Sequence, residues 1–346
     1  MGLSGTGGPG GAAPGPPAVS VIIVNFEGGD DLLRCLASLE RQSGVAEVVL
    51  VDNGSEDGSC RRALALHPAV RVVGEGANRG FAGGANLGAA HAHHDVLLFL
   101  NPDVRLEDGC VAELARALVA PVAVAGPVLA VESSGAREHG GTINHLGMPM
   151  AIAQGAMPLY VSGCALATLR DTFVRLGGFD QRYFLFVEDV EYCWRALNAG
   201  GDVVVAPAAA AWHRGGGSAP GGYLRPGRAY VTSELRIALR ERNTVAMMLA
   251  CAPWWWLPVV IPALVVRALG LAAVSVGLRR PALARSLVGG LGWNASQLPA
   301  SWGRRRTSPR LRAGERAGRR RVVRRALLLR TLLAHGLPRI ARGSGG

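Results

Sequence analysis

The stretch that decides the fold is Leu98-Phe99-Leu100-Asn101-Pro102-Asp103-Val104. An apolar run typical of a buried strand stops at the Asn-Pro-Asp tripeptide, which would deliver the Asp103 carboxylate to the carboxyl end of a strand. Open α/β sheets bind their ligands at that edge. Mg²⁺ is usually held by one or two carboxylates together with substrate phosphates, so Asp103, with Asn101 beside it, suits a metal–diphosphate site. The tripeptide is also ordinary turn chemistry, and that interpretation stays open on these residues alone.

Other apolar segments precede this strand in a regular order. They are nearly continuous in β-branched residues, as in buried strands of parallel sheets, or carry leucines at helical spacing. Asp30 or Asp31 could cap the first helix. The predicted strands are residues 19–26, 47–51, 70–73 and the apolar run 98–100 before the tripeptide, and the predicted helices are residues 30–42 and 85–94. This alternation of strand and helix predicts a doubly wound α/β sheet.

Polar or glycine-rich motifs lie at the ends of these elements and recur further along the chain. In order they are Val24-Asn25-Phe26, Val51-Asp52-Asn53-Gly54-Ser55, Asn78-Arg79-Gly80-Phe81-Ala82-Gly83-Gly84-Ala85-Asn86, Leu100-Asn101-Pro102-Asp103, Ser162-Gly163-Cys164-Ala165, Gly177-Gly178-Phe179-Asp180, residues 186–195 and residues 212–218. The ordered set resembles family-2 inverting glycosyltransferases with the GT-A fold, most closely their rhamnosyltransferase-like branch. The resemblance covers about residues 18–245 and implies a mixed, doubly wound sheet.

The resemblance implies a nucleotide-sugar donor lying across the carboxyl ends of the first strands. Asp52 would contact the nucleobase, and Asn25 would line the same pocket. Asn78, Arg79 and Asn86 would lie along the ribose and the diphosphate. An arginine also suits this place on electrostatic grounds, because its fork matches phosphate oxygens.

A divalent metal, Mg²⁺ or Mn²⁺, is the cofactor that the resemblance implies. Asp103 matches the metal-binding aspartate of the family's Asp-X-Asp element, whereas Asn101 replaces the first aspartate and leaves its own ligation in doubt. His213 corresponds to a metal ligand in the galactofuranosyl branch, although a loop histidine bonded to backbone is an equal alternative. Histidine would suit Mn²⁺ better than Mg²⁺.

The catalytic prediction rests on Glu188 and Asp189, two adjacent acids just before a helix expected to start near Val190. Acids at a helix N-terminus are stabilised by its dipole, so capping is the simpler interpretation. Within the ordered motifs, Asp189 is expected to be the general base that takes a proton from the acceptor hydroxyl, with Glu188 orienting it. The metal and Arg79 would stabilise the leaving diphosphate. Inversion follows from the resemblance.

Composition divides the chain further. Residues 245–277 carry Arg267 as their only charge and contain a tryptophan cluster typical of membrane interfaces. The net charge of +12 comes from residues 304–346, which hold fourteen arginines and one glutamate. This tail is expected to bind anionic lipid and not nucleic acid, because it has no interleaved aromatic residues. The predicted parts are a Gly/Pro-rich leader (1–17), a GT-A catalytic domain (18–244), an apolar membrane-associated helical segment (245–303) and an arginine-rich cytosolic tail (304–346).

The apolar segment is expected to form a shallow membrane-bound hairpin, with a buried helix pair as the alternative. Six scattered cysteines without a secretory signal predict reduced thiols and a place at the cytoplasmic face of the plasma membrane. The expected reaction moves a sugar, first choice rhamnose from dTDP-rhamnose, to a lipid-linked or cell-envelope glycan. UDP-linked galactofuranose and GDP-linked mannose are alternatives. A catalytically inactive membrane-tethered scaffold is the rival of another class.

Overall fold

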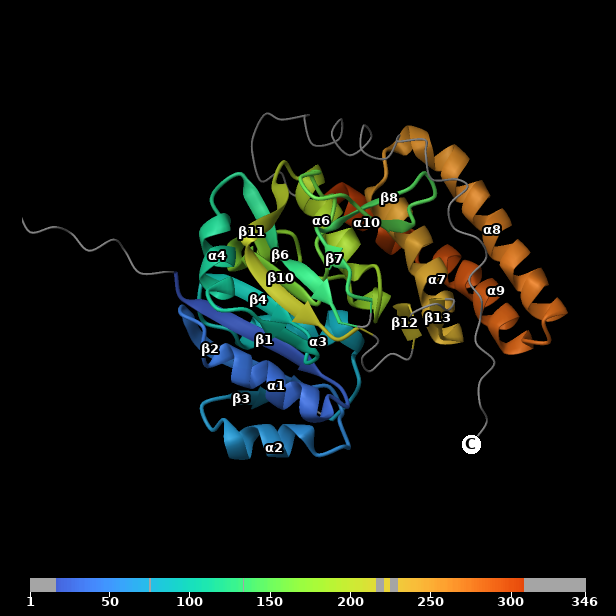
Figure 1. Cartoon of the computed structure of the whole chain (residues 1–346). Coiled ribbons are helices and arrows are strands. Elements are labelled where there is room, and N and C mark those ends of the chain that lie inside the picture. The colour runs from blue at the N-terminus through green and yellow to red at the C-terminus, as the bar shows by residue number, and fades with distance from the viewer. Residues whose placement is uncertain (1–16, 75, 133, 216–220, 225–229, 308–346) are drawn as a thin grey trace, which may run out of the picture.

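The structure is a computed structural model that describes residues 17–74, 76–132, 134–215, 221–224 and 230–307. Its centre is a mixed sheet of nine strands in the described residues, in the order β3-β2-β1-β4-β10-β6-β11-β5, with β7 paired to β6 (Figure 1). These strands are β1 (Val19–Asn25), β2 (Val45–Asp52), β3 (Arg71–Val73), β4 (Val96–Leu100), β5 (Val104–Leu106), β6 (Val122–Val131), β7 (Arg137–Glu138), β10 (Ala165–Leu169) and β11 (Asp202–His213). Two small sheets pair β8 (Gly141–Ile143) with β9 (Pro149–Ala151) and β12 (Gly221–Leu224) with β13 (Tyr230–Thr232).

Helices cover both faces of this sheet because its central strand is apolar on both sides. Along β1, Ile22 and Val24 belong to one core cluster and Val21 and Ile23 to another. This alternation is the period of two expected of a strand. The helices are α1 (Gly29–Leu39), α2 (Ser59–Leu66), α3 (Gly80–His91), α4 (Cys110–Ala117), α5 (Arg170–Arg175), α6 (Glu188–Asn198), α7 (Glu234–Cys251), α8 (Leu257–Gly277), α9 (Pro281–Ser296) and α10 (Leu298–Thr307), with 3-10 turns η1 (Gln181–Tyr183) and η2 (Trp254–Trp256).

The glycine-rich motif after β3 forms most of helix α3 and not an open loop, which corrects the prediction that the helix starts at residue 85. Its glycines allow the helix to lie close to the sheet. A Cβ on Gly84 would stand 2.7 Å from Val24 Cγ1, and one on Gly88 would stand 2.3 Å from Ile22 Cγ2. The motif therefore serves helix–sheet packing as well as the site.

One further prediction about an element was wrong in detail. Helix α1 has Gly28 as its N-cap residue, with Asp30 and Asp31 inside its first turn, so neither acid caps it. The predicted strand before the Asn-Pro-Asp tripeptide ends at Leu100 as expected, and the tripeptide forms a turn that separates β4 from the short strand β5. The tripeptide is therefore a turn, and its role in a metal site stays a prediction.

Helices α7 to α10 pack on one another to one side of the sheet. Helices α8 and α9 lie next to each other, farther from the sheet than α7 (Figure 1). In the described residues one helical stretch, Trp254–Gly277, is long and apolar enough to cross a membrane by length and composition, with 28% of its most apolar window buried. Trp254 is 71% exposed. Helix α10 includes Arg304, so the predicted tail begins inside a helix, and its residues 308–346 lie outside the described residues.

Candidate active site

The Asn-Pro-Asp turn delivers Asp103 to His213. The carbonyl oxygen of Asn101 accepts a hydrogen bond from the Val104 N–H at 3.2 Å, which closes the turn. The following strand, β5, pairs antiparallel with β11, and Val104 stands opposite His213. The Nε2 atom of His213 consequently lies 3.3 Å from Oδ2 of Asp103. Strand pairing thus joins two residues that are far apart in the sequence.

The chemistry of this pair fits a divalent metal. Burial opposes ionisation of Asp103, but the hydrogen bond and charge of His213 outweigh it and lower the pKa of the carboxyl. Two ligands of one octahedral ion with bonds of about 2.1 Å lie about 3 Å apart. Within the residues that the structure describes, no cluster of three or more histidine, cysteine or acidic residues forms. Asp103 and His213 would therefore hold the ion together with the donor's diphosphate oxygens.

Asp189 and Glu188 occupy the first turn of α6, so they lie at the helix N-terminus as predicted. Asp189 is half-buried, and its Oδ2 accepts from the Gly163 N–H at 2.8 Å. Burial raises the pKa of Asp189, although the backbone hydrogen bonds oppose this shift. Burial, and then the charge of Asp189, raises the pKa of Glu188 well above its ordinary value. Burial thus disfavours the charged form of Glu188 more than that of Asp189, whose carboxylate accepts backbone hydrogen bonds.

The segment Ser162 to Cys164 connects the turn that carries Asp103 to Asp189. The carbonyl oxygen of Cys164 accepts from the Asn101 N–H at 2.9 Å, and the neighbouring Gly163 holds Asp189. Burial raises the pKa of the Cys164 thiol, and the charges of Asp103 and Asp189 raise it further. Asp103 and Asp189 therefore both lie within electrostatic range of this one thiol.

A strained loop positions Asp189. Phe184, Phe186 and Val187, just before α6, have φ values of 63°, 69° and 74°. Such angles cost of order 1–3 kcal/mol per residue outside glycine. The Nδ2 atom of Asn243 in α7 lies 3.0, 2.9 and 2.8 Å from the carbonyl oxygens of Tyr183, Leu185 and Phe186. One fully buried amide therefore anchors this loop, and the sequence analysis missed it.

We expect Asn243→Ala to lower kcat as well as stability. The substitution removes the side-chain donor of the partly buried Leu185 and Phe186 carbonyls, a loss of about 1–3 kcal/mol. It also frees the strained loop to relax away from the geometry that holds Asp189. Chemical denaturation and steady-state kinetics check this. Asn198→Ala is the matched control, because Asn198 donates to the Cys251 carbonyl at 3.0 Å away from the loop. An Asn243→Ala variant with lower stability and unchanged kcat would contradict the positioning role.

Asp52, predicted to contact the nucleobase, is the last residue of β2 and lies beside the end of β1. Its Oδ1 accepts from the Ser55 N–H at 2.9 Å, which folds the following loop, and the residue is half-buried. Asn25 is fully buried, and its Nδ2 lies 3.0 Å from Ser55 Oγ and 2.9 Å from Ser59 Oγ. Asn25 therefore supports the loop from below, which corrects its predicted place on the pocket wall.

The motif that begins at Asn78 is held in place by Asn53, a residue to which the sequence analysis gave no role. Its Oδ1 accepts from the Arg79 N–H at 2.9 Å, and its Nδ2 lies 3.1 Å from Oδ1 of Asn78. Asn78 and Arg79 are exposed at the start of α3. Asn86 was predicted to contact the donor, but both ends of its amide bind the backbone of Phe179, at 2.8 and 3.0 Å. Asn86 therefore fastens α3 to the Gly177-Gly178-Phe179-Asp180 segment, and its contact with the donor stays a prediction.

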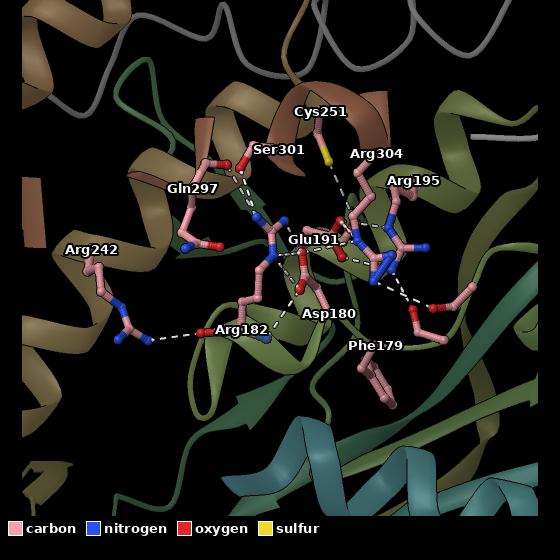
Figure 2. A network of polar contacts seen from close by, with 12 residues as sticks. Phe179, Asp180, Arg182, Glu191, Arg195, Arg242, Cys251, Gln297, Ser301 and Arg304 are labelled. Carbon is pink, nitrogen blue, oxygen red and sulfur yellow. Dashed lines mark hydrogen bonds and ion pairs between the residues drawn. The ribbon is translucent and has the colours of Figure 1, made fainter. Parts of the chain in front are cut away.

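An ion network surrounds Glu191 and Arg195 of α6, the helix that also contains Asp189 (Figure 2). Glu191 and Arg195 in α6 are buried and form a two-pronged pair, with N···O distances of 2.6 and 2.8 Å. Asp180 accepts from Arg182 at 2.6 Å and from Arg304 of α10 at 3.1 Å (Figure 2). Arg304 also lies 3.9 Å from Glu191 of α6. Helix α10 is therefore tied to the helix that contains Asp189, and a truncation of the basic tail should leave Arg304 in place.

The fold and the arrangement at this sheet edge define a GT-A protein of the sugar-transferase class. The profile of Glycosyl transferase family 2 matches residues 20–170, and the chain belongs to that family. The predicted family and fold are confirmed.

This chain is similar in sequence to two relatives and in fold to one solved structure. The N-acetylglucosaminyl-diphospho-decaprenol L-rhamnosyltransferase of Mycobacterium tuberculosis (strain CDC 1551 / Oshkosh) is 31% identical over 236 residues, covering 56% of this chain and 75% of that protein. The low-salt glycan biosynthesis hexosyltransferase Agl10 of Haloferax volcanii is 26% identical over 193 residues, covering 51% of this chain and 61% of that protein. The crystal structure of GalNAc-T7 with UDP, GalNAc and Mn²⁺ shares the fold, with a TM-score of 0.55 and 17% identity over 68% of this chain and 48% of that one.

Proposed function

We propose that this protein transfers a sugar from a nucleotide-diphosphate donor to a hydroxyl of a lipid-linked acceptor, with inversion. The observation that carries the proposal is the convergence of Asp103 and His213 with Asp189 at one sheet edge. A metal on the first pair, together with Arg79, would stabilise the leaving diphosphate. Asp189 would accept the proton of the attacking hydroxyl as the new glycosidic bond forms. Asp52 and Asn78 remain proposed contacts of the donor.

Rhamnose from dTDP-rhamnose is the first choice of donor, since the 31% identical relative is named as a rhamnosyltransferase. The name of this relative also supports a sugar linked through a diphosphate to a polyprenol as the acceptor. Mn²⁺ is the preferred metal because a histidine completes the pair with Asp103. We would measure nucleotide release from dTDP-rhamnose, UDP-galactofuranose and GDP-mannose with Mn²⁺ and a short-chain N-acetylglucosaminyl-diphospho-polyprenol. We expect release from the dTDP sugar. Metal-dependent binding without turnover of any donor would favour an inactive scaffold.

Association with a membrane would bring the enzyme to such an acceptor. Trp254 and Trp255 are 71% and 51% exposed at the start of the long apolar helix, and Val259 and Val266 are about 70% exposed along it. Monomeric soluble proteins rarely expose contiguous apolar patches of this kind. Tryptophan at the end of an apolar helix is typical of the membrane interface. We propose that this face lies on the cytoplasmic side of the plasma membrane, where nucleotide sugars are available.

We expect the double substitution Trp254→Ser/Trp255→Ser to weaken binding to phosphatidylglycerol vesicles by at least about tenfold. Burying a large apolar side chain contributes about 1.5–3 kcal/mol, and tenfold in affinity is about 1.4 kcal/mol. Vesicle co-sedimentation measures the change. The control is Leu66→Ser/Val119→Ser, two exposed apolar residues of the catalytic part. Equal binding by the tryptophan variant and the wild type would show that this face does not meet lipid.

A further inference from the structure

A small pocket lies beside the segment that holds Asp189, and Glu138 on its wall acts electrostatically on His213 of the proposed metal pair. Its volume is about 200 Å³, and its wall includes Glu138 of β7, Tyr160, Ser162 and Arg240 of α7. Sites for drug-sized ligands are typically about 300–1,000 Å³. A pocket of this size therefore suits one monosaccharide ring and not a longer glycan.

The pocket shares a wall with the catalytic machinery. Ser162 lines it, and the next residue, Gly163, donates to Oδ2 of Asp189. The charge of Arg240 acts on both Asp189 and Glu188, opposing the rise in their pKa values that burial causes. A sugar in the pocket would consequently have its hydroxyl groups beside the base.

Two charged side chains on the pocket wall, the exposed Glu138 and the half-buried Arg240, form no side-chain hydrogen bond or ion pair within the residues that the structure describes. The charges of both reach Tyr160, which also lines the pocket. Burial, and then the charges of Asp189 and Glu138, raise the pKa of Tyr160, and the charge of Arg240 opposes the rise. The ring of Tyr160 can occupy this position because residue 141 is glycine, where a Cβ would stand 2.2 Å from Tyr160 Cζ.

We propose that this pocket binds the uncharged sugar of the acceptor, with Glu138 and Arg240 as its specificity-determining residues. A carboxylate accepts hydrogen bonds from sugar hydroxyls, and a guanidinium donates to them. A phosphate or uronic acid group would gain from Arg240 but would also meet Glu138, so the pair selects against an anionic ring. The acceptor's diphosphate therefore lies outside this pocket. The proposal rests on the proposed transfer to a hydroxyl of a glycan acceptor.

Binding of two probes to the full chain tests the proposal without requiring turnover. Saturation-transfer-difference NMR would compare octyl β-glucoside with octyl β-glucuronide, which differ by the carboxylate. We expect the wild type to bind the glucoside at least about fivefold more tightly. Glu138→Gln, which is close in shape, should narrow this preference to less than about twofold. Arg240→Gln should weaken binding of the glucoside about tenfold. Arg137→Gln is the matched control, because Arg137 neighbours Glu138 on β7 but does not line the pocket.

The outcomes separate this proposal from the proposed function. A glucuronide that binds the wild type as well as the glucoside, or a preference that Glu138→Gln leaves unchanged, overturns it, even if sugar transfer is observed. Absence of transfer with every donor would instead count against the proposed function, while the probe preference still reports on the pocket. Calorimetric binding of dTDP with Mn²⁺ should be the same in all three variants, which shows that they are folded. With an active donor, Glu138→Gln and Arg240→Gln should raise KM for the acceptor at least about tenfold and leave KM for the donor unchanged.

Discussion

Asp189→Asn should lower kcat for sugar transfer by about 10²- to 10⁴-fold, the usual contribution of a positioned general base. The amide oxygen can still accept from the Gly163 N–H, as Oδ2 does at 2.8 Å. The substitution removes the proton acceptor and also one backbone hydrogen bond, because Oδ1 of Asp189 accepts from the Val190 N–H at 2.8 Å and the amide has only one oxygen. Steady-state kinetics with saturating donor and acceptor measure the loss, and calorimetric dTDP binding with Mn²⁺ should be unchanged.

The control for this substitution is Asp171→Asn. Asp171 also lies in the first turn of a helix, but it is exposed and pairs with Arg175 at 3.3 Å away from the site. Its removal should leave kcat within about twofold of the wild type, because exposed ion pairs contribute about 0–1 kcal/mol. If Asp189→Asn kept most of its activity, the acid would be a helix-capping residue, and the base would have to be sought elsewhere.

Asp103→Ala should abolish metal-dependent donor binding and not only turnover. Even residues that orient a metal ligand typically contribute about 10- to 100-fold in metal affinity, so we expect loss of the ligand itself to cost at least about 100-fold. The buried His213 would also lose the carboxylate that raises its pKa against the effect of burial. Calorimetric titration of dTDP with and without Mn²⁺ measures the loss, and electron paramagnetic resonance of free Mn²⁺ gives a readout independent of activity.

Asp108→Ala is the matched control for Asp103→Ala. Its carboxylate is 80% exposed and pairs with Arg41 at 3.3 Å, away from His213. This variant should bind dTDP and Mn²⁺ as the wild type does. Unchanged Mn²⁺-dependent binding by Asp103→Ala would exclude Asp103 as a ligand and leave the pair with His213 as a structural contact.

The first half of the fold could be predicted because its signals are local. Strands β1, β2 and β4 are continuous apolar runs, and each prediction lies within a few residues of the observed strand. The Asn-Pro-Asp turn is likewise encoded by residues 101–103. The contact between Asp103 and His213 follows from the pairing of β5 with β11. No local pattern reports such long-range pairing, so the sequence could suggest this contact only through a family resemblance.

The roles of the asparagine side chains were the hardest to predict from the sequence. Asn86 and Asn243 are each fixed by carbonyl groups from segments that lie 57 to 93 positions away in the chain. An amide in a motif therefore looks the same in the sequence whether it binds a ligand or fastens a loop. The strain at Phe184, Phe186 and Val187 is equally hidden, because none of these residues favours a positive φ.

The most direct test of the central claim follows the anomeric carbon during a single reaction. NMR spectroscopy of dTDP-rhamnose with the purified protein, Mn²⁺ and a short-chain N-acetylglucosaminyl-diphospho-polyprenol would record dTDP release and the configuration of the product together. The account predicts release that requires both metal and acceptor, and a product of inverted configuration, because Asp189 activates the hydroxyl for one displacement. A product with retained configuration, or a donor that is bound with Mn²⁺ and never consumed, would contradict it.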